Sequence, residues 1–408
     1  MRSNPIARDQ PGPTPPSSGP GLRRRAFVRL VGGGLVVAGS GLGAGCSRQL
    51  PAEAIEAWAG PPVGETDLRR WLLAHAILAP HSHNLQSWLV DLRTEGEILL
   101  RCDPGRLLPV TDPQFRQIMM SHGTFIELLD LAAREQGLRA DVDLFPQGAF
   151  APDRIDERPV ARIRLVPDAA VARDPLFAQI RARRTNRNVY DPGKPVPAAA
   201  WAAMAEAVRP HALSFGHLDG NRADTIARHR AIAREAWRIE LTTPAAMLES
   251  LKVMRIGAAE VARHRDGLTL MDPMVVWLAR LGLFDRTKAP GPEDFATTSQ
   301  IEDFDRKIAS TPAFLWLVSE GNDRVTQVQA GRAYARVQLA ATAHGVVMQP
   351  LQQALQEYPQ QRKPYGDIHQ LLGAAPPART VQMWARVGFA APVDPAPRRP
   401  LDAVILEA

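Results

Sequence analysis

Two stretches of this chain carry the same pattern of small residues, and this internal repeat constrains the fold more than any other feature of the sequence. In each stretch a glycine is followed eight residues later by Leu-Ala-Ala and then by a second glycine, and the stretches run from Gly123 to Gly137 and from Gly331 to Gly345. Small residues let two helices approach closely. We therefore expect a duplicated unit in which two similar central helices pack together, whereas the competing interpretation is a chance similarity between alanine-rich helices.

Periodic apolar patterns divide the chain into two halves. Helical patterns occur at 66–79, 112–137, 174–183, 198–208, 221–240 and 325–347, and strand patterns at 87–93, 97–103, 138–145, 160–166, 213–218, 312–319 and 382–389. We expect a first half over 47–172 and a second half over 173–408. Residues 241–300 depart from the pattern, and we expect a helical insertion there that either packs into the core or covers a site as a lid.

The distribution of charge excludes one class of partner. The 408 residues carry a net charge of +6, but residues 1–46 contain six arginines against one acid, Asp9. The rest of the chain is therefore nearly neutral, which argues against a protein that binds nucleic acid through its phosphates. A hydrophobic share of 45% and a charged share of 23% are typical of a globular protein.

The leading arginines precede a short apolar run, an arrangement typical of an export signal. Six prolines in residues 1–20 predict a disordered leader. The segment Arg23-Arg24-Arg25-Ala26-Phe27-Val28-Arg29 then precedes an uncharged, glycine-rich run at 30–45 that is too short for a comfortable membrane span. It resembles the twin-arginine signal, which exports folded proteins. We expect residues 1–46 to be a leader and signal peptide, and the alternative is a frayed basic terminus.

A cysteine at the end of the run bears on where the protein resides. Gly43-Ala44-Gly45-Cys46-Ser47 resembles a lipoprotein cleavage site, although Leu42 stands one position further from Cys46 than that pattern requires. Lipid anchoring through Cys46 and simple cleavage both stay open, so we expect a protein that is periplasmic or anchored on the outer face of the inner membrane. With only Cys102 besides Cys46, an intrachain disulfide framework is excluded.

Three polar segments are candidates for chemistry. Residues 79–88 read Ala-Pro-His-Ser-His-Asn-Leu-Gln-Ser-Trp, and the amides of Asn84 and Gln86 there suit the polar edge of a flat ligand, unless the loop is simply solvated. Residues 181–187 read Arg-Ala-Arg-Arg-Thr-Asn-Arg, which suits a phosphate or else a basic surface with ion pairs. Residues 349–353 read Gln-Pro-Leu-Gln-Gln and alone indicate only a helix interruption.

Together these segments resemble the FMN-binding nitroreductase family, in particular its Acg-like double-domain branch. The family signature Ala-Pro-Ser-x-His-Asn-x-Gln-Pro-Trp is matched at Ala79, Pro80, His83, Asn84, Gln86 and Trp88. This chain departs from the signature at Ser87, which removes a proline brace, and at His81, which places a bulkier group beside the expected flavin. Residues 183–187 look like the family's Arg-Arg-Ser/Thr-x-Arg phosphate motif, and 386–389 and 397–401 resemble its closing strand and tail.

The resemblance implies an α+β, nitroreductase-like fold of two pseudo-repeated halves, each with a small, mainly antiparallel sheet packed by helices. Family members form dimers with FMN at the interface. Here both halves lie in one chain, which implies a monomer with a single composite FMN site. The implied site residues are Arg183, Arg184, Thr185 and Arg187, helped by Arg398 or Arg399, for the phosphate; Ser82, His83, Asn84 and Gln86 for the ring or ribityl chain; and Pro350, Leu351 and Gln352 against the ring.

The function that the resemblance implies is an exported FMN-dependent oxidoreductase. Its flavin would take electrons from a small-molecule donor and reduce a nitroaromatic or quinone acceptor, so no catalytic side chain is expected. The alternative is a protein that binds or stores flavin with little turnover. A metal hydrolase using His81 and His83 is a weaker alternative, because a pair at that spacing still needs a third ligand.

Overall fold

Two four-stranded antiparallel sheets form the framework of the protein. The computed structural model describes residues 49–220 and 222–406. The first sheet contains β1 (Trp88–Asp91), β2 (Glu97–Cys102), β3 (Leu138–Leu144) and β4 (Pro159–Pro167), and the second contains β5 (Leu213–Leu218), β8 (Ala313–Glu320), β9 (Val347–Pro350) and β10 (Arg379–Gly388). The strand orders are β1-β2-β4-β3 and β5-β8-β10-β9, so both sheets order their own strands as first, second, fourth and third. The expected α+β class with two similar sheets is confirmed.

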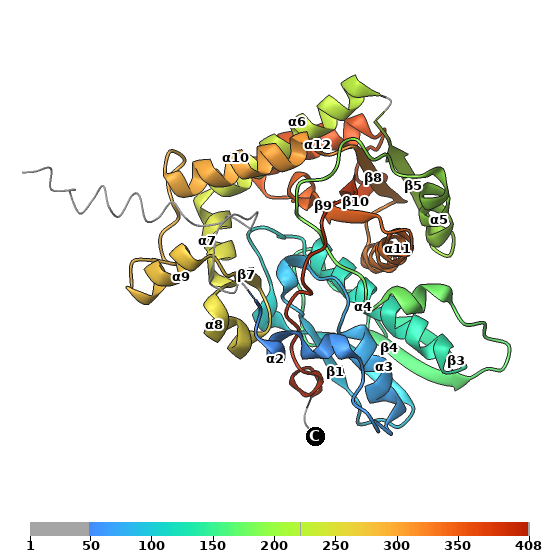
Figure 1. Ribbon diagram of the computed structural model, residues 1–408. Coiled ribbons are helices and arrows are strands. Elements are labelled where there is room, and N and C mark those ends of the chain that lie inside the picture. Colours follow the sequence, from blue (N-terminus) through green and yellow to red (C-terminus); the bar gives the residue numbers. More distant parts are fainter. Residues whose placement is uncertain (1–48, 221, 407–408) are drawn as a thin grey trace, which may run out of the picture.

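The two helices that carry the repeat pack against each other between the sheets (Figure 1). They are α4 (Arg116–Glu135) and α11 (Arg324–Ala343). A Cβ added at Gly123 would lie 2.0 Å from the carbonyl oxygen of Val328, and one added at Gly331 would lie 1.8 Å from that of Met120. Only glycine fits at either position, because each backbone lies directly against the other helix. The expected pair of closely packed central helices is present.

Several element boundaries differ from the sequence-based expectation for local reasons. The helix α3 (Leu68–Ala76) begins at 68 rather than at 66, because Asp67 caps it by accepting a hydrogen bond from the Arg69 N–H at 2.9 Å. The long helix α4 begins at Arg116 rather than at 112, because Phe115 is in the left-handed region. Asp112 still caps this helix, since its carboxylate accepts the N–H groups of the second and third helical residues at 3.2 and 3.0 Å.

The end of the second central helix also differs from expectation. The sequence pattern extended this helix to 347, but Gly345 at φ 66° turns the chain, and β9 follows. The segment 349–353 therefore lies on an edge strand and in the 3-10 helix η5 (Gln352–Leu355) rather than at a helix interruption.

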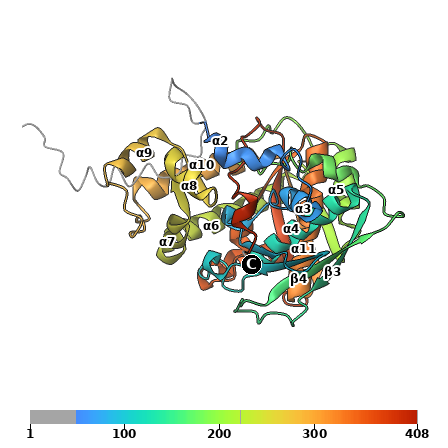
Figure 2. The same cartoon turned by 90° about the horizontal axis from the view of Figure 1, so that it is seen from below.

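The remaining helices cover the sheets and form the insertion. The outer helices are α2 (Ala52–Ile55), α5 (Ala198–Val208), α6 (Ala223–Thr242), α10 (Phe295–Ala309) and α12 (Arg362–Leu371). The insertion contains α7 (Pro244–Lys252), β6 (Met254–Ile256), α8 (Gly257–His264), β7 (Leu268–Leu270) and α9 (Pro273–Arg280). Its apolar residues, among them Met247, Leu251 and Val275, form a core of their own. The insertion stands to one side of the two sheets (Figure 2).

The C-terminal tail returns from the second half to the first. After β10 the chain runs back along the loop that precedes β1, and Val90 exchanges backbone hydrogen bonds with Val404 and Leu406 at 2.8 and 2.7 Å. The tail therefore adds a short edge contact to the first sheet. In the described part of the chain, no helix has the length and apolar character needed to span a bilayer. The expected twin-arginine signal and Cys46 lie outside the described residues.

Candidate functional site

The turn between α3 and β1 adopts a strained backbone. His83, Asn84 and Gln86 all have positive φ values, of 49°, 54° and 53°. Non-glycine residues rarely adopt this region, and strained positions persist only where their surroundings hold them. Here the insertion helps to fix the turn, because the Gly267 N–H donates to the Asn84 carbonyl at 3.0 Å. A turn that is strained and supported in this way is a candidate site.

The two amide side chains of this turn bind the C-terminal tail. The side chain of Asn84 donates to the Pro397 carbonyl at 3.1 Å and accepts from Arg398 at 2.7 Å. The side chain of Gln86 is fully buried, accepts from the Arg399 N–H at 2.8 Å and donates to the Arg265 carbonyl at 2.9 Å. Both amides thus hold the tail and the insertion in place, and their expected contact with the ring or ribityl chain of a flavin stays a prediction.

The two positions that depart from the family signature contact each other. His81 Nε2 lies 2.8 Å from the Ser87 hydroxyl and accepts the Ser87 N–H at 3.1 Å, while His81 Nδ1 lies 2.7 Å from the Ser82 carbonyl. A proline at 87 would have no N–H group, so the serine brings a buried donor that the imidazole satisfies. The His81 ring packs edge-on against Trp88, and its expected position beside a flavin stays a prediction.

Two buried arginines join the arginine segment to this turn. Arg183 donates to the Leu78 carbonyl at 3.1 Å and to Gln338 at 3.2 Å. Arg398 donates to the same Leu78 carbonyl at 3.2 Å and to the Ala79 carbonyl at 3.0 Å. Burial lowers the pKa of Arg398 well below its usual range, and the positive charge of Arg183 acts in the same direction. The arginine segment and the asparagine-bearing turn therefore meet, although they come from different halves.

The more open side of the same segment presents Arg184, Thr185 and Arg187. Arg184 donates to the carbonyls of Arg181 and Arg183, both at 2.8 Å, and Thr185 accepts a long hydrogen bond from Gln338 at 3.4 Å. Arg187 is exposed and has no hydrogen-bond or ion-pair partner among the described residues. Desolvation nevertheless lowers the pKa of Arg187. The Arg187 charge also acts on the pKa of His83, so Arg187 lies close to the turn 81–87 although water reaches it.

The charge of this region is offset only in part by an acidic side chain, since the Asp394 charge acts on Arg184. Every hydrogen-bond partner of Arg183, Arg184 and Arg398 within the described residues is neutral. Burial lowers the pKa of His83 to about 4, with the positive charge of Arg187 adding to the effect, so this imidazole is neutral at pH 7. This cluster of arginines therefore carries an excess of positive charge, which an anion would offset.

The remaining predicted residues lie in two other places. Arg399 turns away from the cluster, because its side chain donates to the Gln86 and Ala403 carbonyls. Leu351 is buried and donates its N–H to the Trp384 carbonyl at 2.8 Å, and Gln352 donates to the Gln382 carbonyl at 3.2 Å.

Leu351 and Gln352 follow Pro350, the last residue of β9. The strand β9 is tied to the arginine segment, since the Asn186 N–H donates to the Met348 carbonyl at 3.1 Å.

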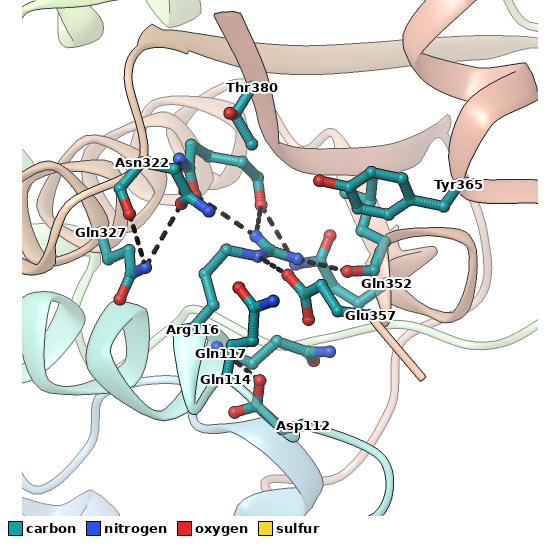
Figure 3. A network of polar contacts seen from close by, with 12 residues as sticks. Asp112, Gln114, Arg116, Gln117, Asn322, Gln327, Gln352, Glu357, Tyr365 and Thr380 are labelled. Carbon is teal, nitrogen blue, oxygen red and sulfur yellow. Dashed lines mark hydrogen bonds and ion pairs between the residues drawn. The ribbon is translucent and has the colours of Figure 1, made fainter. Parts of the chain in front are cut away.

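The sequence reasoning missed a buried polar network at the start of α4 (Figure 3). Arg116 is fully buried and donates to Glu357 at 2.6 Å, to the Leu355 carbonyl at 2.6 Å and to the Gln382 carbonyl at 2.8 Å. Burial raises the pKa of the Asp112 carboxyl to about 7, and the Glu357 charge acts in the same direction. Because Arg116 belongs to the first half and its partners belong to the second, this network joins the two halves.

The equivalent arginine of the second half makes a corresponding contact with the first half. Arg324 begins α11 as Arg116 begins α4, and each stands seven residues before its repeat glycine. The Arg324 side chain is buried and donates to the carbonyls of Gln114, Ala151 and Pro152 at 2.7, 2.6 and 2.9 Å, all in the first half. Extending the repeat seven residues towards the N-terminus would have found both arginines.

The histidines of the turn are poorly placed to bind a metal. Both ring nitrogens of His81 are engaged, with Ser82 and with Ser87, and His83 Nδ1 lies 3.2 Å from the Ser82 hydroxyl. Within the described ranges, no three His, Cys, Asp or Glu side chains come together as a metal site would require. The pair His81 and His83 therefore lacks the geometry that a metal hydrolase needs.

Comparison with known proteins finds similarity to nitroreductases. Two Mycobacterium tuberculosis proteins, from strains CDC 1551 and H37Rv, are each named "putative NAD(P)H nitroreductase" and are 29% identical to this chain over 343 residues, which cover 82% of this chain and 90% of the relative. The solved structure of the FMN-dependent nitroreductase NfnB from Mycobacterium smegmatis in complex with NADPH is 18% identical, covers 56% of this chain and 96% of its own, and has a TM-score of 0.33.

A nitroreductase with bound FMN from Bacteroides fragilis is 14% identical, covers 53% of this chain and 89% of its own, and has a TM-score of 0.29. No protein-family model matches the chain.

Proposed function

We propose that this nitroreductase-like chain is an FMN-dependent oxidoreductase that binds one flavin between its two halves. The carrying observation is that Arg183, from the second half, and Arg398, from the tail, share the Leu78 carbonyl just before the turn 81–87 of the first half, and that Arg398 also donates to Asn84 within that turn. The length of the similarity to proteins named as NAD(P)H nitroreductases supports the same activity. In this proposal NAD(P)H donates the electrons, and a nitroaromatic or quinone accepts them.

Unsatisfied polar atoms support the fit of a phosphorylated cofactor. The Nε atoms of Arg183 and Arg398 and the hydroxyl of Tyr334 are buried without a hydrogen-bond partner among the described residues. Tyr334 lies on α11 close enough to Arg183 and Arg187 for their charges to act on its pKa. Buried polar groups without a partner are costly, and a bound phosphate with its ordered water would satisfy several of them.

The residues of this chain bind and orient in this proposal. Arg184 and Arg187 hold the phosphate, with the Thr185 hydroxyl as a further donor, because guanidinium forks match phosphate oxygens. Arg183 and Arg398 build the wall behind them. Ser82 and His83 line the first-half side, and the segment 350–352 faces the ring. The bound flavin supplies the hydride chemistry, so no side chain of the chain needs to act as a general base.

The activity is tested on the purified full-length chain. Anaerobic mixing with NADPH should bleach the flavin absorption, and adding nitrofurazone or menadione should restore it over many cycles. The substitution Arg187→Ala should abolish turnover at low FMN, whereas Arg209→Ala, which removes an exposed arginine paired with Glu206, should not. Flavin that is bound but neither reduced by NADPH nor reoxidised by an acceptor would support the storage function instead.

Export is a separate part of the proposal and rests on the sequence alone. We propose that the twin-arginine signal carries the folded, flavin-loaded chain out of the cytoplasm, which suits a protein whose site is assembled from both halves. Replacing Arg24 and Arg25 by lysine should retain the protein in the cytoplasmic fraction. Replacing Cys46 by alanine should release it from the membrane fraction if that cysteine is lipidated, and its distribution should be unchanged after simple cleavage. Because both halves lie in one chain, light scattering should find a monomer.

A further inference from the structure

The indole of Trp58 lies at the centre of the guanidinium cluster. The Cζ atom of Arg184 lies 4.2 Å from the ring centroid, that of Arg398 5.1 Å and that of Arg183 5.5 Å. Trp58 belongs to the 3-10 helix η1 (Glu56–Ala59), outside every motif of the sequence analysis, and only 7% of it is exposed. Three cations on one aromatic residue are unusual, since contacts of this kind occur about once per 70–80 residues.

The surrounding chain fixes the position of this indole. The Trp58 ring N–H donates to the Ala396 carbonyl at 2.8 Å, and its backbone carbonyl accepts from Arg181 at 3.2 Å. Nearby, the Arg398 N–H donates to the Ala54 carbonyl at 2.9 Å. The segment 52–59 therefore bridges the arginine segment and the C-terminal tail, and the ring has one defined place between them.

The choice of an aromatic group at this place has a consequence for charge. The face of an indole attracts guanidinium groups and offsets part of their mutual repulsion, but it carries no net charge. A carboxylate in the same position would also gather the arginines, yet it would neutralise them and repel a phosphate. Trp58 thus brings positive groups together and leaves their charge available to an anion.

We propose that Trp58 is a positioning residue that holds Arg184 in the anion site and thereby sets the preference of the protein for FMN over riboflavin. Arg184 is the member of the trio that stays partly open to solvent, and it is the one nearest the ring. Riboflavin lacks the phosphate and gains nothing from Arg184. This inference rests on the proposed function, because it assumes that the anion is the phosphate of a flavin.

The test compares binding of the two flavins by variants of the full-length chain. Trp58→Leu keeps an apolar side chain and removes the aromatic face, while Trp58→Phe keeps the face and removes the ring N–H. Trp201→Leu is the matched control, since Trp201 is 6% exposed on α5 and contacts Phe215 and His217 instead of arginines. Fluorescence titration gives the Kd for FMN and for riboflavin, and thermal unfolding with inorganic phosphate reports on the anion site without flavin.

The expected result is a selective loss. Trp58→Leu should weaken FMN binding about tenfold or more, change riboflavin binding little and lose the stabilisation by phosphate, while Trp58→Phe recovers most of the FMN affinity. Trp201→Leu should lower stability without changing the ratio of the two Kd values. Equal weakening of both flavins by Trp58→Leu, or an unchanged FMN Kd, would overturn the inference.

The failure of the proposed function gives a different result. If the wild-type chain binds neither flavin, and phosphate stabilises the wild-type chain but not Trp58→Leu, then the anion site exists and FMN is not its ligand. A wild-type chain that gains no stability from phosphate would overturn the role of Trp58 as well.

Discussion

Arg398 donates a hydrogen bond of 2.7 Å to the side-chain oxygen of Asn84, a residue 314 positions away in the chain. The same guanidinium shares the Leu78 carbonyl with Arg183. Three segments, one from the first half, one from the start of the second half and one from the C-terminal tail, therefore meet at a single carbonyl. The proposed site exists only when both halves are folded against each other.

Removing the open guanidinium should weaken the phosphate contact alone. Arg187→Ala is expected to raise the Kd for FMN about 10- to 100-fold, because a hydrogen bond to a charged group contributes about 1.5–3 kcal/mol. Riboflavin binding should change much less. Equilibrium titration of both flavins measures the difference, and equal losses would place the phosphate elsewhere.

The contact between the two central helices should not tolerate a side chain. Gly331→Ala is expected to lower the free energy of unfolding by about 3 kcal/mol or more, because the new Cβ would lie 1.8 Å from the Met120 carbonyl oxygen. Gly366→Ala on α12 is the control, since a Cβ there meets nothing within 4 Å and alanine favours a helix by up to about 1 kcal/mol. Urea denaturation compares the two, and similar effects would contradict the packing.

Removing only one partner of the buried ion pair between Arg116 and Glu357 should be strongly destabilising. Arg116→Met is expected to lower the free energy of unfolding by about 3–5 kcal/mol, because it leaves the buried Glu357 carboxylate without its cation. Adding Glu357→Gln should recover part of that loss. Arg93→Met removes an arginine that is 61% exposed in its pair with Asp91 and should cost less than about 1 kcal/mol. An equal loss of unfolding free energy in Arg116→Met and Arg93→Met would argue against a stabilising contact between the halves at Arg116.

Stability should fall as the pH drops from 7 towards 5. Burial lowers the pKa of nine of the ten histidines, to about 4 for His83, His229 and His369. Between pH 6.5 and 4 the unfolded chain binds more protons at His83, His229 and His369 than the folded chain does, so each of these three reduces stability by up to about 1.4 kcal/mol per pH unit. The other six histidines act in the same direction.

Three carboxyl groups oppose this trend. Burial raises the pKa of Asp112 and of Glu240 to about 7 and also raises the pKa of Asp130, so all three stabilise the fold as the pH falls. The histidines outnumber them, and urea denaturation at pH 7, 6 and 5 should show a net loss. A constant or rising stability over that range would mean that the histidines are not desolvated in the folded state.

The repeat and the antiparallel strands could be predicted because their signals are local. Gly123 and Gly331 mark the helix contact by their spacing alone, and alternation of apolar residues located strands such as β5 at its observed bounds, Leu213–Leu218. The roles of Asn84 and Gln86 could not be predicted in this way. Their amides bind the tail and the insertion, partners up to 314 residues distant, and no local pattern encodes that choice.

Trp58 was missed for a related reason. It lies in a short segment without periodicity, and its three cationic neighbours come from two other parts of the chain. The pairing of His81 with Ser87 shows the opposite case. Each residue departs from the family signature, and two departures six residues apart in one loop could have been considered as one coupled change.

The stoichiometry of FMN binding tests the central claim most directly. The purified full-length chain, freed of flavin and titrated with FMN, should bind one FMN per chain with quenching of the flavin fluorescence, and Arg187→Ala should lose that binding at the same concentrations. A chain that binds no FMN, or that binds two with Arg187 irrelevant to either, would contradict a single flavin site built from both halves.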